Sequence, residues 1–212
     1  MSLPLIQRDP PPLVSWASEL LAMGSLSSPI FGGPPRQAAG ALLRALGSLV
    51  GDLGAAFEQD VHRQCEVVAE HAPGWTLTAQ LLQKVPTDPG AGYARSAERF
   101  HLDLAPRELA GGLRLIRLYF GAGTRWIPRD NEPASLRQLR ESPRDTLSLP
   151  RYQEEMASLE RHPPLFEQVP PGHTLLYGGG LEDGLVHRAP PCVEPRLLLV
   201  VTATSVPPGR SP

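Results

Sequence analysis

Apolar residues recur along the 212-residue chain at two different spacings, and the change between them falls near residue 75. Between residues 34 and 74 they form one stripe at steps of three, four or seven: Leu42, Leu46, Leu49, Leu53, Phe57, Val61 and Val68. This spacing is that of one face of an α-helix. Glycines inside the stripe, beginning with Gly47, predict a division into two helices. A further helix is expected over residues 13–24.

After Trp75 the pattern becomes that of β-strands separated by turns. Segments that alternate or are continuously apolar are bounded by clusters of glycine and proline. These segments occupy residues 75–85, 111–123, 173–180, 184–191 and 195–206. A short helix is expected over 150–164. Helices followed by strands indicate an α+β fold, in which N-terminal helices brace an antiparallel sheet or barrel.

The same change of pattern predicts how the chain is organised. Residues 1–74 are expected to form a helical segment that braces the core, and residues 75–206 the core itself. Residues 207–212 are expected to be a disordered tail. The length suits one domain with a helical extension, and it is enough to bury a core without disulfides or metals.

Composition narrows the classes of partner. Twenty basic and 22 acidic residues give a formal net charge of −2, so no basic field attracts nucleic acid or an anionic membrane. Cys65 and Cys192 are too few for a disulfide framework or a cysteine-rich zinc site. No run of about 18 apolar residues occurs, and the first residues do not resemble a signal peptide. We therefore expect a cytoplasmic protein without nucleic-acid or membrane partners, whose oligomeric state the sequence does not indicate.

Candidate metal ligands lie in the stretch "RFHLD". Residues i and i+2 of a strand point to the same face, so His101 and Asp103 can aim at one point. An imidazole nitrogen and a carboxylate oxygen suit a first-row metal, although such a pair alone is a weak motif. His187 lies in a later strand-like segment, and Arg196 opens the strand after it. In an antiparallel hairpin, Arg196 can project into the same cavity as His187.

This order of residues resembles a known group of enzymes. H-x-D, a long gap, His, and Arg about ten residues later is the pattern of iron(II)/2-oxoglutarate-dependent oxygenases, which are double-stranded β-helix (jelly-roll) enzymes. "LRLIRLYFGAGTRWIP" and "VPPGHTLLY" are similar to segments flanking the ligands in those enzymes. More narrowly, "RFHLD", "RLYFGAGTRW" and "LVHRAPP…RLLLVVT" resemble an uncharacterised bacterial family, domain of unknown function 1826, over about residues 75–205. The resemblance implies N-terminal helices packed on an antiparallel jelly roll.

The resemblance also implies a site with defined roles. His101, Asp103 and His187 would bind Fe(II) on one face and leave three positions open. The 2-oxo acid end of 2-oxoglutarate suits two of these positions, and oxygen the third. Arg196 would hold the distal carboxylate through a bidentate, permanently charged fork. Tyr119 would add a phenolic hydrogen bond to this cosubstrate.

Several assignments stay open at this point. Arg188 competes with Arg196 as the anion partner, but neighbours in a strand point to opposite faces, so we expect Arg188 to face away from the metal. Arg125 and Trp126 are candidates for binding substrate, with core packing an equal alternative for Trp126. Enzymes of this kind often carry a serine two residues after the arginine, where this chain has Leu198. That difference leaves the cosubstrate open.

Three functions therefore compete. The first is an Fe(II)- and 2-oxoglutarate-dependent dioxygenase that hydroxylates or otherwise oxidises a small-molecule or peptide substrate. The second is a non-catalytic jelly roll that binds zinc through the same three ligands and a water. The third is an interaction module that uses the helical half as its binding face. The sequence does not identify the substrate.

Overall fold

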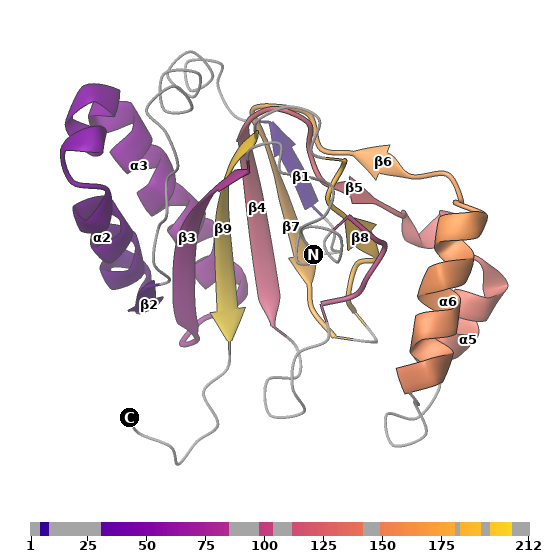
Figure 1. The fold of residues 1–212 in the computed structure, drawn as a ribbon. Helices are drawn as coiled ribbons and strands as arrows, with labels where there is room; N and C mark the ends of the chain where they lie inside the picture. The colour runs from indigo at the N-terminus through magenta and orange to yellow at the C-terminus, as the bar shows by residue number, and fades with distance from the viewer. Residues whose placement is uncertain are drawn as a thin grey trace.

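The structure is a computed structural model, shown as a ribbon in Figure 1. It describes residues 5–8, 31–84, 98–103, 112–141, 149–180, 183–191 and 196–204. The helix expected over 13–24 and the tail expected over 207–212 lie outside the described residues. In the described part of the chain, no helix is both long and hydrophobic enough to pass through a lipid bilayer.

The larger of two sheets has six strands in the order β1-β7-β4-β9-β3-β2, and every pairing in it is antiparallel. Its strands are β1 (Leu5–Arg8), β7 (His173–Gly178), β4 (Leu113–Phe120), β9 (Arg196–Thr204), β3 (Thr76–Lys84) and β2 (Phe31–Gly33). The four central strands fall in the segments that the hydrophobic pattern predicted. Both edge strands come from the first 74 residues, where the pattern indicated only helices.

The smaller sheet carries β6, β5 and β8 in that order, and it is also antiparallel. Its strands are short: β6 (Glu167–Gln168), β5 (Arg125–Trp126) and β8 (His187–Arg188). An isolated antiparallel backbone bridge between His101 and His187 places the segment 98–103 beside β8. The two residues exchange both backbone hydrogen bonds, at 2.9 and 3.0 Å, so their side chains are fixed next to each other.

Two helices cover one face of the larger sheet, α2 (Pro35–Leu46) and α3 (Ser48–His71), as Figure 1 shows. The predicted division falls at Gly47, whose φ of 56° is readily adopted only by glycine. Alternation along the strands gives this face an apolar surface, since Leu197, Leu199 and Val201 of β9 pack in one core with α3. The intervening residues of each strand therefore face the opposite side of the sheet.

That opposite side is closed by the smaller sheet. Helices α5 (Ala134–Glu141) and α6 (Leu149–Arg161), with the short 3-10 helix η3 (Arg129–Asn131), lie beyond it, on the side away from α2 and α3 (Figure 1). Phe100 and Leu102 pack with α5 and α6 in a separate core. Because neighbours in an extended segment point to opposite faces, this packing turns His101 and Asp103 toward the space between the sheets.

Candidate metal centre

A cavity of about 440 Å³ opens between the two sheets. Its lining comes from three strands of the larger sheet, from the segments that carry the two histidines and from the residue before β5: Thr78, Gln80, Leu82, His101, Arg114, Ile116, Thr124, His187, Ala189, Arg196, Leu198, Val200 and Thr202. This volume and this mixture of apolar and polar groups are typical of a small-molecule site.

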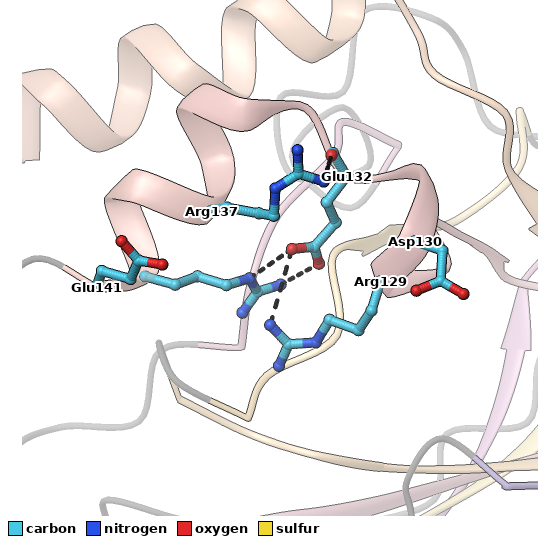
Figure 2. A pocket seen from close by; sticks show the side chains of 6 residues that line it. Arg129, Asp130, Glu132, Arg137 and Glu141 are labelled. Carbon is cyan, nitrogen blue, oxygen red and sulfur yellow. Dashed lines mark hydrogen bonds and ion pairs between the residues drawn. The ribbon is translucent and has the colours of Figure 1, made fainter.

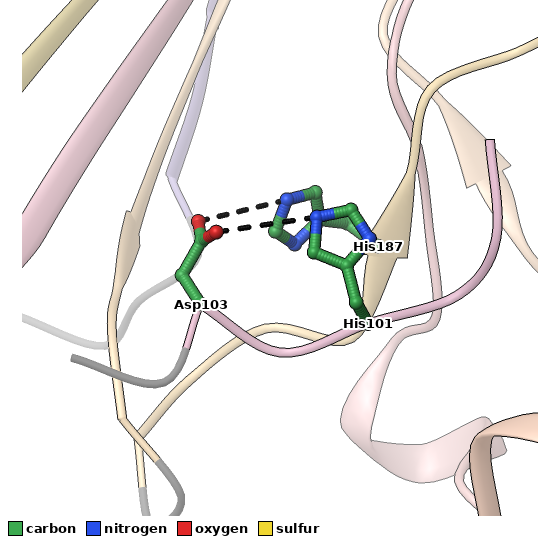
Figure 3. A group of neighbouring side chains, drawn as sticks. All are labelled: His101, Asp103 and His187. Carbon is green, nitrogen blue, oxygen red and sulfur yellow. Dashed lines mark ion pairs between the residues drawn. The ribbon is translucent and has the colours of Figure 1, made fainter. Parts of the chain in front are cut away.

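The three predicted metal ligands meet beside this cavity, and His101 and His187 line it. Potential ligand atoms of His101, Asp103 and His187 all lie within 4.8 Å of one another. The Nε2 atoms of His101 and His187 are 4.0 and 3.6 Å from the two carboxylate oxygens of Asp103. Figure 3 shows the carboxylate facing both rings. Two imidazoles and one carboxylate are the donor set of a facial Fe(II) site, so these residues fit the implied metal.

Backbone carbonyl groups fix the orientation of both imidazole rings. The Nδ1–H of His187 donates to the carbonyl of Leu185 at 2.9 Å, and the Nδ1–H of His101 donates to the carbonyl of Arg99 at 2.8 Å. Each acceptor lies two residues before its histidine. With Nδ1 acting as donor, the lone pair of each ring is on Nε2, the atom that faces Asp103. Both rings are thus arranged to bind a metal through Nε2.

The charge states also suit a divalent cation. Burial lowers the pKa of His187 to about 4, although the nearby Asp103 opposes this shift. The ring is therefore neutral at pH 7 and can act as a ligand. Burial raises the pKa of Asp103, but His187, Arg114, His101 and a hydrogen bond from Tyr177 outweigh burial and hold that pKa below its usual value. Asp103 is accordingly ionised at neutral pH.

Two partners of Asp103 were not predicted. Arg114 of β4 places its Nη1 2.7 Å from Oδ2 of Asp103, and the hydroxyl of Tyr177 in β7 donates to the same oxygen at 3.0 Å. The Tyr177 hydroxyl is also 3.3 Å from Nε2 of His187. Burial raises the pKa of Tyr177 well above its usual value, so this hydroxyl keeps its proton and donates. Strand 113–120 carries two arginines, Arg114 and Arg117, among mostly apolar residues, and this was the available signal for a charged group on each face.

Helix α6 supports the ligand segment from its outer side. Glu160 accepts the backbone N–H of Phe100 through Oε1 at 2.5 Å, and its Oε2 accepts Nη1 of Arg188 at 2.9 Å. The hydroxyl of Tyr152 accepts the N–H of Leu102 at 3.0 Å. The guanidinium carbon of Arg188 lies 4.3 Å from the centre of the Phe100 ring. One carboxylate thus joins the residue before His101 to the residue after His187.

These contacts also answer the question about Arg188. Its guanidinium is turned toward α6 and Phe100, so the structure confirms that Arg188 faces away from the metal ligands. Arg196 is 5% exposed and lines the cavity together with both histidines. Of the two arginines considered as anion partners, Arg196 is the one in the cavity.

The two residues proposed to bind substrate lie elsewhere. Trp126 is buried in the core between the sheets and pairs in register with His187, which agrees with the core-packing alternative. Arg125 is turned outward: its Nε is 3.3 Å from Oε1 of Gln168, and its guanidinium carbon lies 5.3 Å from the centre of the Phe166 ring. Strand alternation explains this, because Arg125 is the neighbour of inward-facing Trp126.

The cosubstrate role predicted for Tyr119 is wrong. Its hydroxyl donates to Oδ2 of Asp60 at 2.7 Å, and its ring packs against Phe57, both residues of α3. Tyr119 and Arg114 are five residues apart in β4, so they point to opposite faces of the sheet. The face of Tyr119 is the one that α2 and α3 cover.

A second hollow, shown in Figure 2, has about 620 Å³ of space beside η3 and α5. Its charged lining balances three arginines against three carboxylates: Arg129, Arg137, Arg140, Asp130, Glu132 and Glu141. Buried Glu132 accepts Nε and Nη2 of Arg140 at 2.8 and 2.5 Å. This pairing joins the end of η3 to α5, and its geometry is that of a structural ion pair.

The sequence was compared with family models and with curated proteins. Residues 94–201, about half of the chain, match the family model described as "Protein of unknown function (DUF1826)". No curated protein is significantly similar in sequence.

Similar solved structures include the Kdo hydroxylase KdoO, a non-heme Fe(II) α-ketoglutarate-dependent dioxygenase. Its apo structure matches with a TM-score of 0.52 and 14% identity, over 96% of this chain and 80% of that chain. Its complex with succinate and Fe(III) gives 0.50 and 15%, over 96% and 79%. A Pseudomonas putida prolyl-4-hydroxylase gives only 0.42 and 13%, over 94% and 98%. At such identities the likeness to KdoO shows the fold alone, and it confirms the predicted double-stranded β-helix.

Proposed function

This chain belongs to the DUF1826 family, and we propose that it is an oxygenase that uses Fe(II) and 2-oxoglutarate to oxidise a bound substrate. The observation that carries the proposal is the orientation of the ligands. His101 and His187 both present Nε2 to the carboxylate of Asp103, at the wall of a cavity large enough for a cosubstrate and a substrate. When bound, Fe(II) and 2-oxoglutarate would supply the activation of oxygen.

Arg196 is the residue that we assign to the cosubstrate. It begins β9, is buried, and lines the same cavity as the two histidines. An arginine fork binds a carboxylate through two parallel hydrogen bonds and stays charged when buried. Apolar side chains of Leu82, Leu198 and Val200 line the cavity on the same sheet and would limit the access of water to the bound acid.

Two further residues would keep the ligand carboxylate in position. Tyr177 donates to Oδ2 of Asp103, and Arg114 contacts the same oxygen, so Oδ1 is the atom left facing His101. Hydrogen bonds of this kind to a ligand fix its orientation and tune its affinity for metal. The three ligands alone would also suit zinc, which is the competing function.

Anaerobic titration with Fe(II) tests this proposal. We expect the protein to bind one Fe(II), and the subsequent addition of 2-oxoglutarate to produce a weak visible charge-transfer band. His101→Ala should remove both responses, because it deletes one of three ligands. His162→Ala changes an exposed histidine and should leave both unchanged. Zn(II) binding with no response to Fe(II) and 2-oxoglutarate would support the zinc-binding alternative instead.

A further inference from the structure

We propose that the substrate is a small organic anion and that Arg114 recognises its negative charge. This inference rests on the proposed function, since it concerns the space that remains once metal and 2-oxoglutarate are bound. It begins from the order in which polar and apolar side chains lie along the floor of the cavity.

The floor changes from polar to apolar along the strands. Arg114 of β4 is paired in register with Thr202 of β9, which is paired with Thr78 of β3. These three residues form one polar row, in which the Thr78 hydroxyl lies 3.4 Å from the carbonyl oxygen of Thr202. Only alternate side chains of a strand face the cavity. The next row on the floor is therefore formed by the residues two positions along each strand.

The remaining rows separate this polar row from Arg196. Ile116, Val200 and Gln80 form the second row, and Leu118, Leu198 and Leu82 form the third. Arg196 follows at the start of β9, six residues before Thr202, which corresponds to about 20 Å of extended strand. The two arginines therefore serve opposite ends of the cavity, with largely apolar surface between them.

The position of the Arg114 guanidinium assigns it to the metal end of the cavity. It contacts Asp103, a proposed metal ligand, whereas Arg196 is placed at the far end of the floor. If Arg196 holds the distal carboxylate of 2-oxoglutarate, as proposed above, Arg114 lies where the substrate must approach the metal. Its side chain is 34% exposed, so it is accessible to a molecule in the cavity.

Charge balance indicates what that molecule carries. A divalent metal and the two arginines bring four positive charges, while Asp103 and 2-oxoglutarate bring three negative charges. Among the described residues that line the cavity there is no carboxylate. Counted over the described residues, one positive charge is then in excess, and a cavity lined by one sign of charge attracts a ligand of the opposite sign. A substrate with a carboxylate or similar anion restores neutrality.

The pairing of Arg114 with Asp103 is compatible with this role. A guanidinium presents five N–H donors, so the contacts of Arg114 with Asp103 and with the Tyr177 hydroxyl use part of its capacity. When Asp103 binds a divalent metal, its negative charge is shared with the metal and attracts Arg114 less strongly. The same side chain can then donate to an anion in the cavity, beside the hydroxyl groups of Thr78 and Thr202.

Ligand-observed NMR on the full chain loaded with Zn(II) and saturated with 2-oxoglutarate tests the inference. The probes are matched acid and amide pairs: butanoate with butanamide, and phenylacetate with phenylacetamide. We expect the acids to bind at least tenfold more tightly than the amides. Arg114→Leu should remove this preference, and Arg114→Lys should keep part of it, because lysine retains the charge but not the fork. Arg36→Leu, on exposed surface of α2, is the matched control and should bind like the wild type.

Separate measurements distinguish failure of this inference from failure of the proposed function. Calorimetric titration of the wild type with metal and 2-oxoglutarate comes first, and an absence of binding there overturns both. If metal and 2-oxoglutarate bind but acids and amides bind equally, or neither binds, the substrate inference alone is wrong. It is also wrong if Arg114→Leu weakens metal binding but keeps the preference for acids, since Arg114 would then only position Asp103.

Discussion

The two faces of the larger sheet carry clusters of the same composition, an aspartate, an arginine and a tyrosine in contact. On the helix-covered face, Asp60 of α3 is 3.3 Å from Nε of Arg117 and accepts the Tyr119 hydroxyl at 2.7 Å. On the cavity face, Asp103 contacts Arg114 and Tyr177 at 2.7 and 3.0 Å. Arg117 and Arg114 come from the same strand, β4, so alternation alone sends them to different environments.

Burial and additional partners separate the two clusters. Asp60 also accepts Nε2 of Gln64 at 3.0 Å, Arg117 donates to the carbonyl of Gly172 at 2.5 Å, and both charged side chains are at most 5% exposed. This cluster is enclosed and holds α3 to the sheet. The Asp103 carboxylate is instead 20% exposed and faces nitrogens of two imidazole rings, both of which line the cavity. Residue types are thus a poor marker of a site unless accessibility and nearby ligand atoms are considered with them.

The largest expected difference concerns the two aspartates. Asp60→Ala leaves the buried charge of Arg117 without its carboxylate, and we expect it to lower the free energy of unfolding by about 3–5 kcal/mol. Asp103→Ala leaves a partly exposed Arg114, and it should change the stability of the metal-free protein by at most about 1 kcal/mol. Urea unfolding monitored by circular dichroism measures both variants under the same conditions.

For metal affinity we expect the opposite order, with the larger effect from the Asp103 variant. Asp103→Ala deletes a proposed ligand and should raise the dissociation constant for Mn(II) by more than the roughly 100-fold that loss of an outer partner costs. Asp60→Ala, measured at a temperature where it is fully folded, should bind Mn(II) like the wild type. Equal losses of metal affinity in the two variants would contradict the assignment of one cluster to stability and the other to function.

Glu160 of α6 is expected to affect metal affinity without being a ligand itself. Glu160→Ala removes the acceptor that links Phe100 to Arg188, so the segments carrying His101 and His187 lose a common support. We expect Mn(II) affinity to fall about 10-fold, as for other outer partners of metal ligands. Calorimetric titration with Mn(II) measures this change. Glu154→Ala, at an exposed position of the same helix, is the matched control. An equal loss of affinity in that control would show that the effect is not specific to the contacts of Glu160.

Local patterns in the sequence were enough to predict much of this architecture. The change of apolar spacing near residue 75 marks where α3 gives way to β3, and Gly47 marks the break between α2 and α3. The candidate ligands could be grouped because His101 and Asp103 lie at i and i+2 of a segment that the pattern suggested to be extended, and His187 follows in a recognisable order. The edge strand β1 was missed because its contribution is backbone pairing with β7, which leaves no apolar period of its own.

The faces of β4 could not be predicted in the same way. Both faces of β4 carry apolar residues that suit a core, and each face also carries one arginine. Choosing the cavity face requires knowing which side of the sheet α3 covers, and α3 is distant from β4 in the sequence. The choice of Tyr119 as a site residue failed for this reason. Tyr177 was missed because its contact with Asp103 joins residues that are 74 positions apart in the sequence.

The smallest expected effects come from the two tyrosine hydroxyl groups. Tyr119→Phe removes one hydrogen bond from the buried Asp60 and should lower the free energy of unfolding by about 1 kcal/mol, with no change in Mn(II) affinity. Tyr177→Phe removes one hydrogen bond from the proposed metal ligand Asp103 and should change Mn(II) affinity about fivefold, the equivalent of about 1 kcal/mol. Urea unfolding and calorimetry on both variants separate these outcomes. If Tyr119→Phe alters metal affinity and Tyr177→Phe does not, the sheet transmits strain from its helix face to the site, and the two clusters are not independent.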